Sequence, residues 1–481
     1  MTGELSQCQG EGGAWMDAAI PIPYRIGRAL VRAALGFYFT RIERFHRERV
    51  PLTGPVLFAS NHPNSLTDAF VIGTSVPRKV NFVATVLLFQ FAAARWVLRK
   101  CGVIPINRVK DDPRAMRTVV NTFAACHRVL EAGEAVGIFP EGITHDDPQL
   151  KNPKTGAARM ALELEDRHGG TLGLQIVPVG LTFPAKDTYR STALVNFGEP
   201  IRVADYLAAY AQNRHQGIRS LHAEIQRRIE GLMVHLPHLE RARVVAAVKR
   251  LYLDRLRVAN TVIHEPVSPQ VGELLLTQAI ATAVNAAFEK HPARATEFVQ
   301  RLDSYESRLA RLHLSDEVLA HFPQRRRLAM QSLAWAVLAV LGAPVAFYGW
   351  LHRFIPYAIL KLALQRTAKK SLDRIHVSTT AVLVGLLIFG PFYAACVAVF
   401  HQFFGWPATL WYALSLPGAS LLAHYYLREV RRFAASLRAL TILLRAPMAA
   451  RRLMAEREAL IELIAAERVQ MRGEQTLQKG A

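Results

Sequence analysis

The chain has 481 residues, enough for one large domain or for two to three ordinary ones. Its net charge is +21, and a balance this basic favours nucleic acid, an anionic membrane surface or an acidic substrate as the partner. No zinc-finger, homeodomain or RNA-recognition signature is present, and the basic residues flank apolar stretches, so we expect membrane lipids and no nucleic acid. The four cysteines lie far apart without metal-binding spacing, and we expect no metal site.

Residues 1–21 are rich in glycine, which predicts a disordered start. Between residues 22 and 49, apolar side chains are interleaved with arginines, and this pattern predicts an amphipathic interfacial helix. Such a helix lies on a membrane surface with its guanidinium groups among lipid phosphates, or it packs on its own domain. The sequence leaves both alternatives open.

From residue 50 to 202, strand-like runs alternate with helical ones, which predicts an α/β domain with a mixed sheet flanked by helices. The expected strands are 55–59, 80–85, 102–106, 135–139, 174–181 and 192–197. The expected helices are 64–75, 87–99, 113–132 and 154–168. Because strand ends converge at one edge of such a sheet, the loops that follow several strands are expected to share a site.

The first strand-like run ends at Ser-Asn-His-Pro-Asn, a cluster that cannot continue a strand. This places His62 at a strand-to-helix elbow, with Asp68 about one and a half turns into the helix. A carboxylate that reaches the far ring nitrogen fixes the tautomer and stabilises the imidazolium, which is the arrangement of a general base. An isolated pair of this kind is more often a solvated polar turn, so the rest of the chain has to decide.

Three further blocks follow in order: the strand Gly102–Arg108, which ends in a cation, then Phe139-Pro140-Glu141-Gly142, and the strand Ile176–Gly180. Together with the block from His62 to Asp68, they resemble the glycerolipid acyltransferase family over roughly residues 50–202. The closer likeness is to the branch of glycerol-3-phosphate and dihydroxyacetone-phosphate acyltransferases that carries Asn-His-Pro-Asn and a C-terminal membrane region.

The fit has one departure. The wider family has four residues between the histidine and the aspartate, whereas five separate His62 from Asp68 here. One added residue rotates a helical side chain by about 100°. Either the elbow absorbs the extra residue, at Pro63-Asn64, or Asp68 is not the partner. That branch shares the longer spacing, so Asp68 stays the expected partner.

The resemblance implies that His62 removes a proton from the acceptor hydroxyl as this attacks a thioester, with Asp68 orienting the ring. It needs no covalent acyl-enzyme and no cofactor, and the sequence has no Gly-x-Ser-x-Gly elbow. Arg108 is the expected phosphate ligand. The remaining substrate-binding candidates are Asn64, Glu141 and Gly142, which would position the acceptor, and Lys154, which would meet a phosphate.

The implied function is a membrane-bound O-acyltransferase of phospholipid biosynthesis. It moves a fatty acyl group from acyl-coenzyme A or acyl carrier protein to glycerol 3-phosphate or 1-acylglycerol 3-phosphate. Acylation of another lysolipid and a catalytically silent, lipid-binding membrane scaffold remain alternatives. The acceptor, the acyl chain length, the carrier and the oligomeric state are not determined by the sequence.

Beyond this domain, residues 203–327 predict a helical extension, and residues 328–427 predict a membrane region. The uncharged stretches 328–351, 377–400 and 402–423 are each long enough to span a bilayer. The first either spans or re-enters, and the other two form a hairpin. Residues 428–481 predict a basic amphipathic tail. The positions of the basic flanks predict a multi-pass protein of the cell (inner) membrane with its catalytic domain in the cytoplasm.

Overall fold

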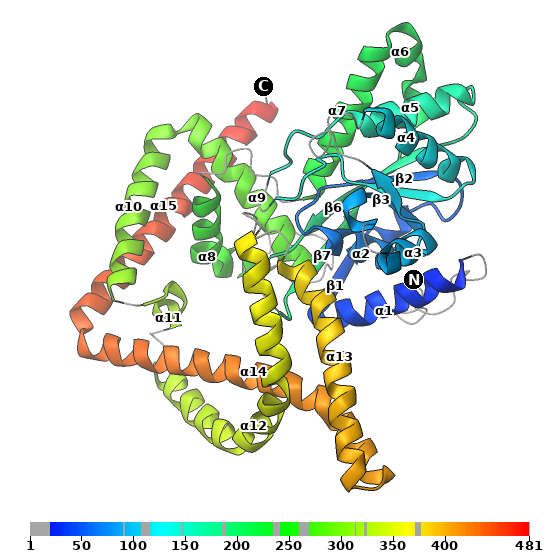
Figure 1. Cartoon of the computed structure of the whole chain (residues 1–481). Helices are drawn as coiled ribbons and strands as arrows, with labels where there is room; N and C mark the ends of the chain where they lie inside the picture. The colour runs from blue at the N-terminus through cyan, green and yellow to red at the C-terminus, as the bar shows by residue number, and fades with distance from the viewer. Residues whose placement is uncertain are drawn as a thin grey trace, which may run out of the picture. The chain divides into compact units, whose positions relative to one another are not determined.

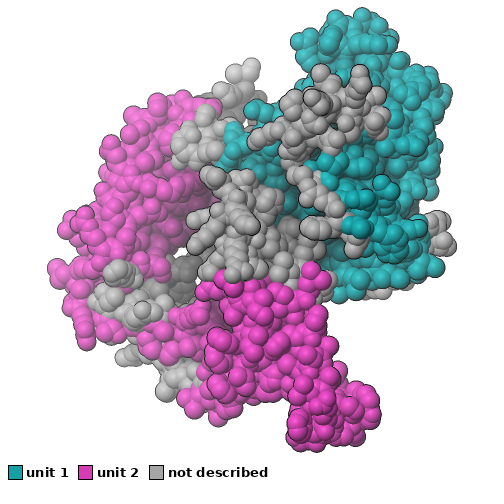
Figure 2. Space-filling model, viewed as in Figure 1, with its two compact units in different colours: residues 1–235, 364–386 teal, residues 236–363, 387–481 magenta. Residues whose placement is uncertain are grey.

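The computed structural model describes residues 20–89, 92–106, 116–145, 147, 149–184, 189–233, 241–258, 269–312, 314–321, 325–370 and 377–480. The chain divides into two compact units (Figure 2). Unit 1 comprises residues 1–235 and 364–386, and unit 2 comprises residues 236–363 and 387–481. Each unit has its own hydrophobic clusters.

Unit 1 is built on a mixed eight-stranded sheet with the order β1-β7-β6-β2-β5-β3-β4, and β8 pairs with β6 at the side (Figure 1). Its central strands run parallel, whereas β7 and β8 run antiparallel to β6. The predicted α/β fold is confirmed, and each predicted strand is present within two residues. The strands are β1 (Arg41–Phe45), β2 (Val56–Ser60), β3 (Val80–Thr85), β4 (Ile104–Ile106), β5 (Ala135–Ile138), β6 (Gln175–Thr182), β7 (Thr192–Phe197) and β8 (Ile201–Arg202).

Helices cover both faces of this sheet, as the residues of β2 show. All five residues of β2 are buried, as expected for a strand covered on both sides. Val56 and Phe58 point into a cluster with α1 (Ile22–Tyr38) and α2 (Leu66–Ser75). The alternate residues Leu57 and Ala59 point into a cluster with α4 (Met116–Glu131), α5 (Gly156–Arg167) and α7 (Arg214–Leu232). The other helices of unit 1 are α3 (Ala92–Lys100) and α6 (Leu207–Gln212).

The two largest differences from the sequence-based prediction concern the boundaries of elements. The helix expected over residues 22–49 ends at Tyr38, and residues 41–45 pair in parallel with β7 as an edge strand. Alternating charged and apolar residues fit either element, and pairing with a distant strand decides between them. The second boundary is the end of the α/β unit. α7 buries Leu221, Ile225 and Ile229 beneath the sheet, so the unit extends to residue 235 instead of ending at 202.

α1 packs on its own domain, which is one of the two alternatives considered for it; that it also lies on a membrane surface stays a prediction. It buries Tyr24, Leu35 and Tyr38 against the domain. On its outer side it exposes Ile22, Ile26 and Leu30, which are spaced four residues apart and therefore share one face.

Unit 2 is helical. Two hydrophobic clusters join α8, α9, α10, α11 and α15. The predicted helical extension is thus present. The helices of this part of the chain are α8 (Ala242–Val258), α9 (Pro269–Lys290), α10 (Pro292–Arg311), α11 (Asp316–His321), α12 (Arg325–Lys370), α13 (Val377–Phe403), α14 (Trp406–Arg445) and α15 (Pro447–Gly480).

The stretches 328–351, 377–400 and 402–423 lie within α12, α13 and α14. Among the described residues, no helix combines the length and the apolarity that crossing a bilayer requires. The predicted membrane spans are therefore not found. α12 continues past the first stretch through His352 and Arg353, and α14 carries Ser415 and Ser420 within the third.

Candidate active site

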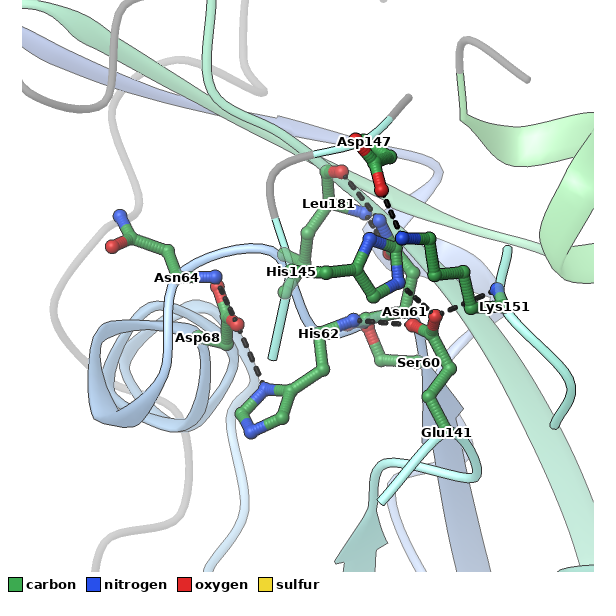
Figure 3. A network of polar contacts seen from close by, with 10 residues as sticks. All are labelled: Ser60, Asn61, His62, Asn64, Asp68, Glu141, His145, Asp147, Lys151 and Leu181. Atoms are coloured by element: carbon green, nitrogen blue, oxygen red, sulfur yellow. Dashed lines mark hydrogen bonds and ion pairs between the residues drawn. The ribbon is translucent and has the colours of Figure 1, made fainter. Parts of the chain in front are cut away.

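The elbow between β2 and α2, residues 61–65, holds His62 (Figure 3). Asn61 anchors it to the neighbouring strand β6. Its side-chain oxygen accepts a hydrogen bond from the Leu181 N–H at 2.7 Å, and its amide donates to the Leu181 carbonyl at 2.9 Å. Because Asn61 is buried, this pair of bonds fixes the backbone directly before His62.

His62 and Asp68 form a hydrogen-bonded pair. His62 Nδ1 lies 2.9 Å from Oδ2 of Asp68, which is fully buried in the first turn of α2. The same oxygen accepts the Asn64 N–H at 2.7 Å. An ionised carboxylate only accepts, so Nδ1 carries the proton and Nε2 of the neutral ring keeps its lone pair. The His62 side chain as a whole is 11 % exposed.

The structure also shows how the extra residue between His62 and Asp68 is accommodated. α2 begins at Leu66, two residues later than predicted, so the added residue lies in the elbow and not in the helix. Ser65, directly before the helix, has a φ of 53°, a left-handed value that lets the chain turn sharply there. Asp68 therefore reaches His62 despite the longer spacing.

The imidazole of His62 stacks on the ring of Phe139. The rings of His62 and Phe139 have their centroids 4.0 Å apart with an interplanar angle of 16°, and Phe82 stacks behind Phe139 at 6.2 Å. Gly137 makes room for this stack, because a Cβ there would lie 2.5 Å from the Phe82 ring. Sequence reasoning missed the role of Phe139, although an aromatic residue at the end of a buried strand beside Pro-Glu-Gly was a usable signal.

Glu141 lies behind the elbow and is buried. Its Oε1 accepts the backbone N–H of His62 at 2.9 Å. Its Oε2 accepts the backbone N–H of Lys151 at 2.9 Å and contacts Nε2 of His145 (Figure 3). Both oxygens thus hold protein donors. That Glu141 and Gly142 position acceptor hydroxyls stays a prediction, and Gly142 has a φ of 64° that favours glycine.

Lys154 lies beside Gly142. A Cβ on that glycine would lie 3.4 Å from Nζ of Lys154, while the Lys154 backbone N–H donates to the Pro140 carbonyl at 2.8 Å. Within the described part of the chain, this exposed ammonium group has no hydrogen bond or ion pair, so it is a cation available to an anion. Arg108, the other predicted phosphate ligand, lies outside the described residues.

The structure therefore brings together six predicted residues within unit 1: His62 and Asn64 on the elbow, Asp68 on α2, and Glu141, Gly142 and Lys154 on the segment that follows β5. A base with a fixed tautomer, a buried carboxylate that holds it and a free cation nearby can together deprotonate a hydroxyl on an anionic molecule.

Comparison with known proteins defines the class. The family model for acyltransferases matches residues 41–182, which include β1 to β6, the elbow and Glu141. The chain therefore contains a domain of the acyltransferase family, and the resemblance read from the four sequence blocks is confirmed.

Two of the relatives have names that specify a glycerol phosphate as the acceptor. The chain is 25% identical over 280 residues to glycerol-3-phosphate O-acyltransferase 1 of Saccharomyces cerevisiae, covering 54% of this chain and 35% of that protein. It is 24% identical to the 1-acyl-sn-glycerol-3-phosphate acyltransferase of Bacillus subtilis, covering 37% of this chain and 87% of the relative. The chain thus spans about a third of the yeast protein. The crystal structure of the 1-acyl-sn-glycerophosphate acyltransferase of Thermotoga maritima aligns with a TM-score of 0.33 and 16% identity, over 44% of this chain and 79% of that one.

Proposed function

We propose that the protein transfers a fatty acyl group from an acyl thioester to the hydroxyl of a phosphorylated glycerol, either glycerol 3-phosphate or its 1-acyl derivative. The observation that carries this proposal is the 2.9 Å pair of His62 and Asp68 at the elbow of an acyltransferase-family domain. The names of the yeast and Bacillus relatives support the two acceptors.

In this mechanism the acceptor hydroxyl approaches Nε2 of His62. Nε2 takes the hydroxyl proton while the oxygen attacks the thioester carbonyl, and general-base help of this kind is worth about 10²–10⁴-fold in rate. Asp68 stabilises the resulting imidazolium through Nδ1. The tetrahedral intermediate then expels the thiolate, which takes the proton from His62. The ester and the free thiol leave, and the enzyme returns to its starting state.

The acceptor phosphate is assigned to Lys154, whose free ammonium lies beside Gly142, and to Arg108. The donor is acyl-coenzyme A or acyl carrier protein. Donor and product are amphiphiles, so we place the enzyme at a membrane surface. α1 is the element that we assign to the lipid surface, because its exposed Ile22, Ile26 and Leu30 are flanked by exposed Arg25 and Arg32.

The test is acyl transfer by the purified full chain in detergent, from labelled palmitoyl-coenzyme A and from the acyl carrier protein thioester. Glycerol 3-phosphate, 1-acylglycerol 3-phosphate and a lysophospholipid without a bare phosphate are offered side by side. We expect product with a phosphorylated acceptor, no product from His62→Ala, and a raised acceptor KM for Arg108→Ala. Activity that survives His62→Ala contradicts the mechanism. An inactive wild type with all acceptors and both donors favours a lipid-binding scaffold.

A further inference from the structure

A second histidine lies buried behind the elbow. His145 is 9 % exposed and follows Glu141 by four residues. Its Nε2 contacts Oε2 of Glu141, whereas its Nδ1 has no hydrogen-bond partner among the described residues. Burying a polar atom without a partner is unfavourable, and an apolar side chain of similar size would avoid that cost. Packing alone therefore does not explain why a histidine occupies this position.

The contacts of Glu141 supply that reason. Its carboxylate joins two backbone segments that are far apart in the sequence, the elbow at His62 and the end of the loop at Lys151. His145 is the side-chain donor to this carboxylate, and it lies inside the loop that the carboxylate closes (Figure 3). An ion pair between Asp147 and Lys151 ties the same loop together.

We propose that His145 is a positioning residue for acyl transfer, which holds Glu141 against the backbone N–H of His62 and so keeps the imidazole between Asp68 and Phe139. This inference rests on the proposed function. Neither His145 nor its bond to Glu141 touches the reacting atoms. Without the histidine donor, the carboxylate keeps two backbone partners but loses the side chain that fixes its rotation. The His62 backbone then gains freedom at the point where the ring orientation is set.

The expected signature follows from geometry. A misplacement of about 1 Å in a catalytic group costs on the order of 10²-fold in rate. His145→Leu removes the donor, and we expect kcat to fall by about 10- to 100-fold with every acceptor, while the KM values for acceptor and thioester change by less than about 3-fold. His145→Gln keeps an N–H donor near the position of Nε2, and we expect it to restore most of kcat.

A further variant keeps the test decisive if His145→Leu folds poorly. Glu141→Gln replaces one oxygen by an amide NH₂, which then faces a backbone N–H of His62 or Lys151. We expect the same loss of kcat at nearly constant acceptor KM. A Glu141 that instead binds acceptor hydroxyls shows a raised KM that differs between acceptors, and that result overturns the proposal.

His127→Leu is the matched control. His127 is also buried and hydrogen-bonded, with Nε2 at 3.1 Å from the Met160 carbonyl. It lies on α4, whose Cys126 and Leu130 belong to the cluster on the opposite face of the sheet from α2. We expect its loss to lower Tm and to leave kcat unchanged. An equal fall of kcat in His127→Leu, or full kcat in His145→Leu, refutes the positioning role. A wild type without activity on any acceptor refutes the proposed function instead.

Discussion

Two buried carboxylates in this protein, Asp68 and Asp316, are hydrogen-bonded to different kinds of side chain. In unit 1, Asp68 is fully buried and bonds His62, whose side chain is 11 % exposed. In unit 2, Asp316 is 4 % exposed and accepts the Tyr305 hydroxyl at 2.6 Å and Nε of Arg457 at 3.0 Å. Burial, and then the hydrogen bond to Asp316, raises the pKa of Tyr305. The first carboxylate is paired with an imidazole, whose other ring nitrogen can take up a proton, and the second is paired with a guanidinium and a buried phenol.

The comparison teaches how a site differs from a structural ion pair. Both carboxylates satisfy the rule that a buried charge needs partners. Only at Asp68 does the partner have a second nitrogen able to accept a proton. We therefore expect substitutions at Asp68 to change the reaction rate and substitutions at Asp316 to change stability.

The largest expected effect is at Asp68. Asp68→Asn keeps the shape of the side chain but removes the charge that stabilises imidazolium and fixes the tautomer. We expect kcat to fall by about 10²–10⁴-fold with little change in the free energy of unfolding. Steady-state kinetics and denaturant unfolding measured on one preparation check this. A near-normal kcat in Asp68→Asn would contradict the distinction between the two carboxylates, because Asp68 would then have only a structural role, as Asp316 has.

The converse is expected at Asp316. Asp316→Ala leaves Arg457 and Tyr305 without their shared acceptor, and we expect a loss of about 3 kcal/mol in the free energy of unfolding of unit 2. Tyr305→Phe, which removes one hydrogen bond, costs about 1 kcal/mol. Acyl transfer below the unfolding transition is expected to be unchanged in both. A fall in kcat at a temperature where Asp316→Ala is folded would falsify this assignment.

A smaller effect is expected at the free cation beside Gly142. Lys154→Ala removes a charged hydrogen-bond donor, and we expect the KM of the phosphorylated acceptor to rise by about 10-fold while kcat is kept. Lys154→Arg is the control, because it retains the charge. Kinetics with glycerol 3-phosphate at increasing salt sharpen the result, since the difference between wild type and Lys154→Ala should shrink. An unchanged KM removes Lys154 from the phosphate site.

The smallest effect is a pH dependence at the control histidine. Burial lowers the pKa of His127, with a smaller opposing contribution from the hydrogen bond to Met160. Below about pH 6.5 the unfolded chain binds a proton that the folded state does not. Stability is therefore fully present above that pH and decreases as the pH falls toward the folded pKa. We expect Tm to drop less between pH 7.5 and about pH 5.5 in His127→Leu than in wild type. Parallel curves contradict this.

Much of unit 1 follows from local sequence, because strand runs, proline and glycine breakers and helix periodicity act over a few residues. The runs before His62 and before Phe139 are short and apolar, and they form β2 and β5 as predicted. The order of the four blocks sufficed to identify the family. The spacing of His62 and Asp68 was readable, but the position of the extra residue was not, because it depends on a left-handed Ser65.

Only the tertiary structure decided the contacts between residues that are distant in the sequence. Arg41–Phe45 become a strand because β7, which is distant in the sequence, offers a free edge for Arg41 to pair with Thr192. Asn61 fixes the elbow through its hydrogen bonds with Leu181. Glu141, which the sequence shows only as part of a motif, is buried by folding and accepts the backbone N–H of His62. His145, which looks ordinary in the sequence, gains its role in the same way. Burial and long-range pairing are set by the whole chain, so the sequence names these residues and the fold assigns their partners.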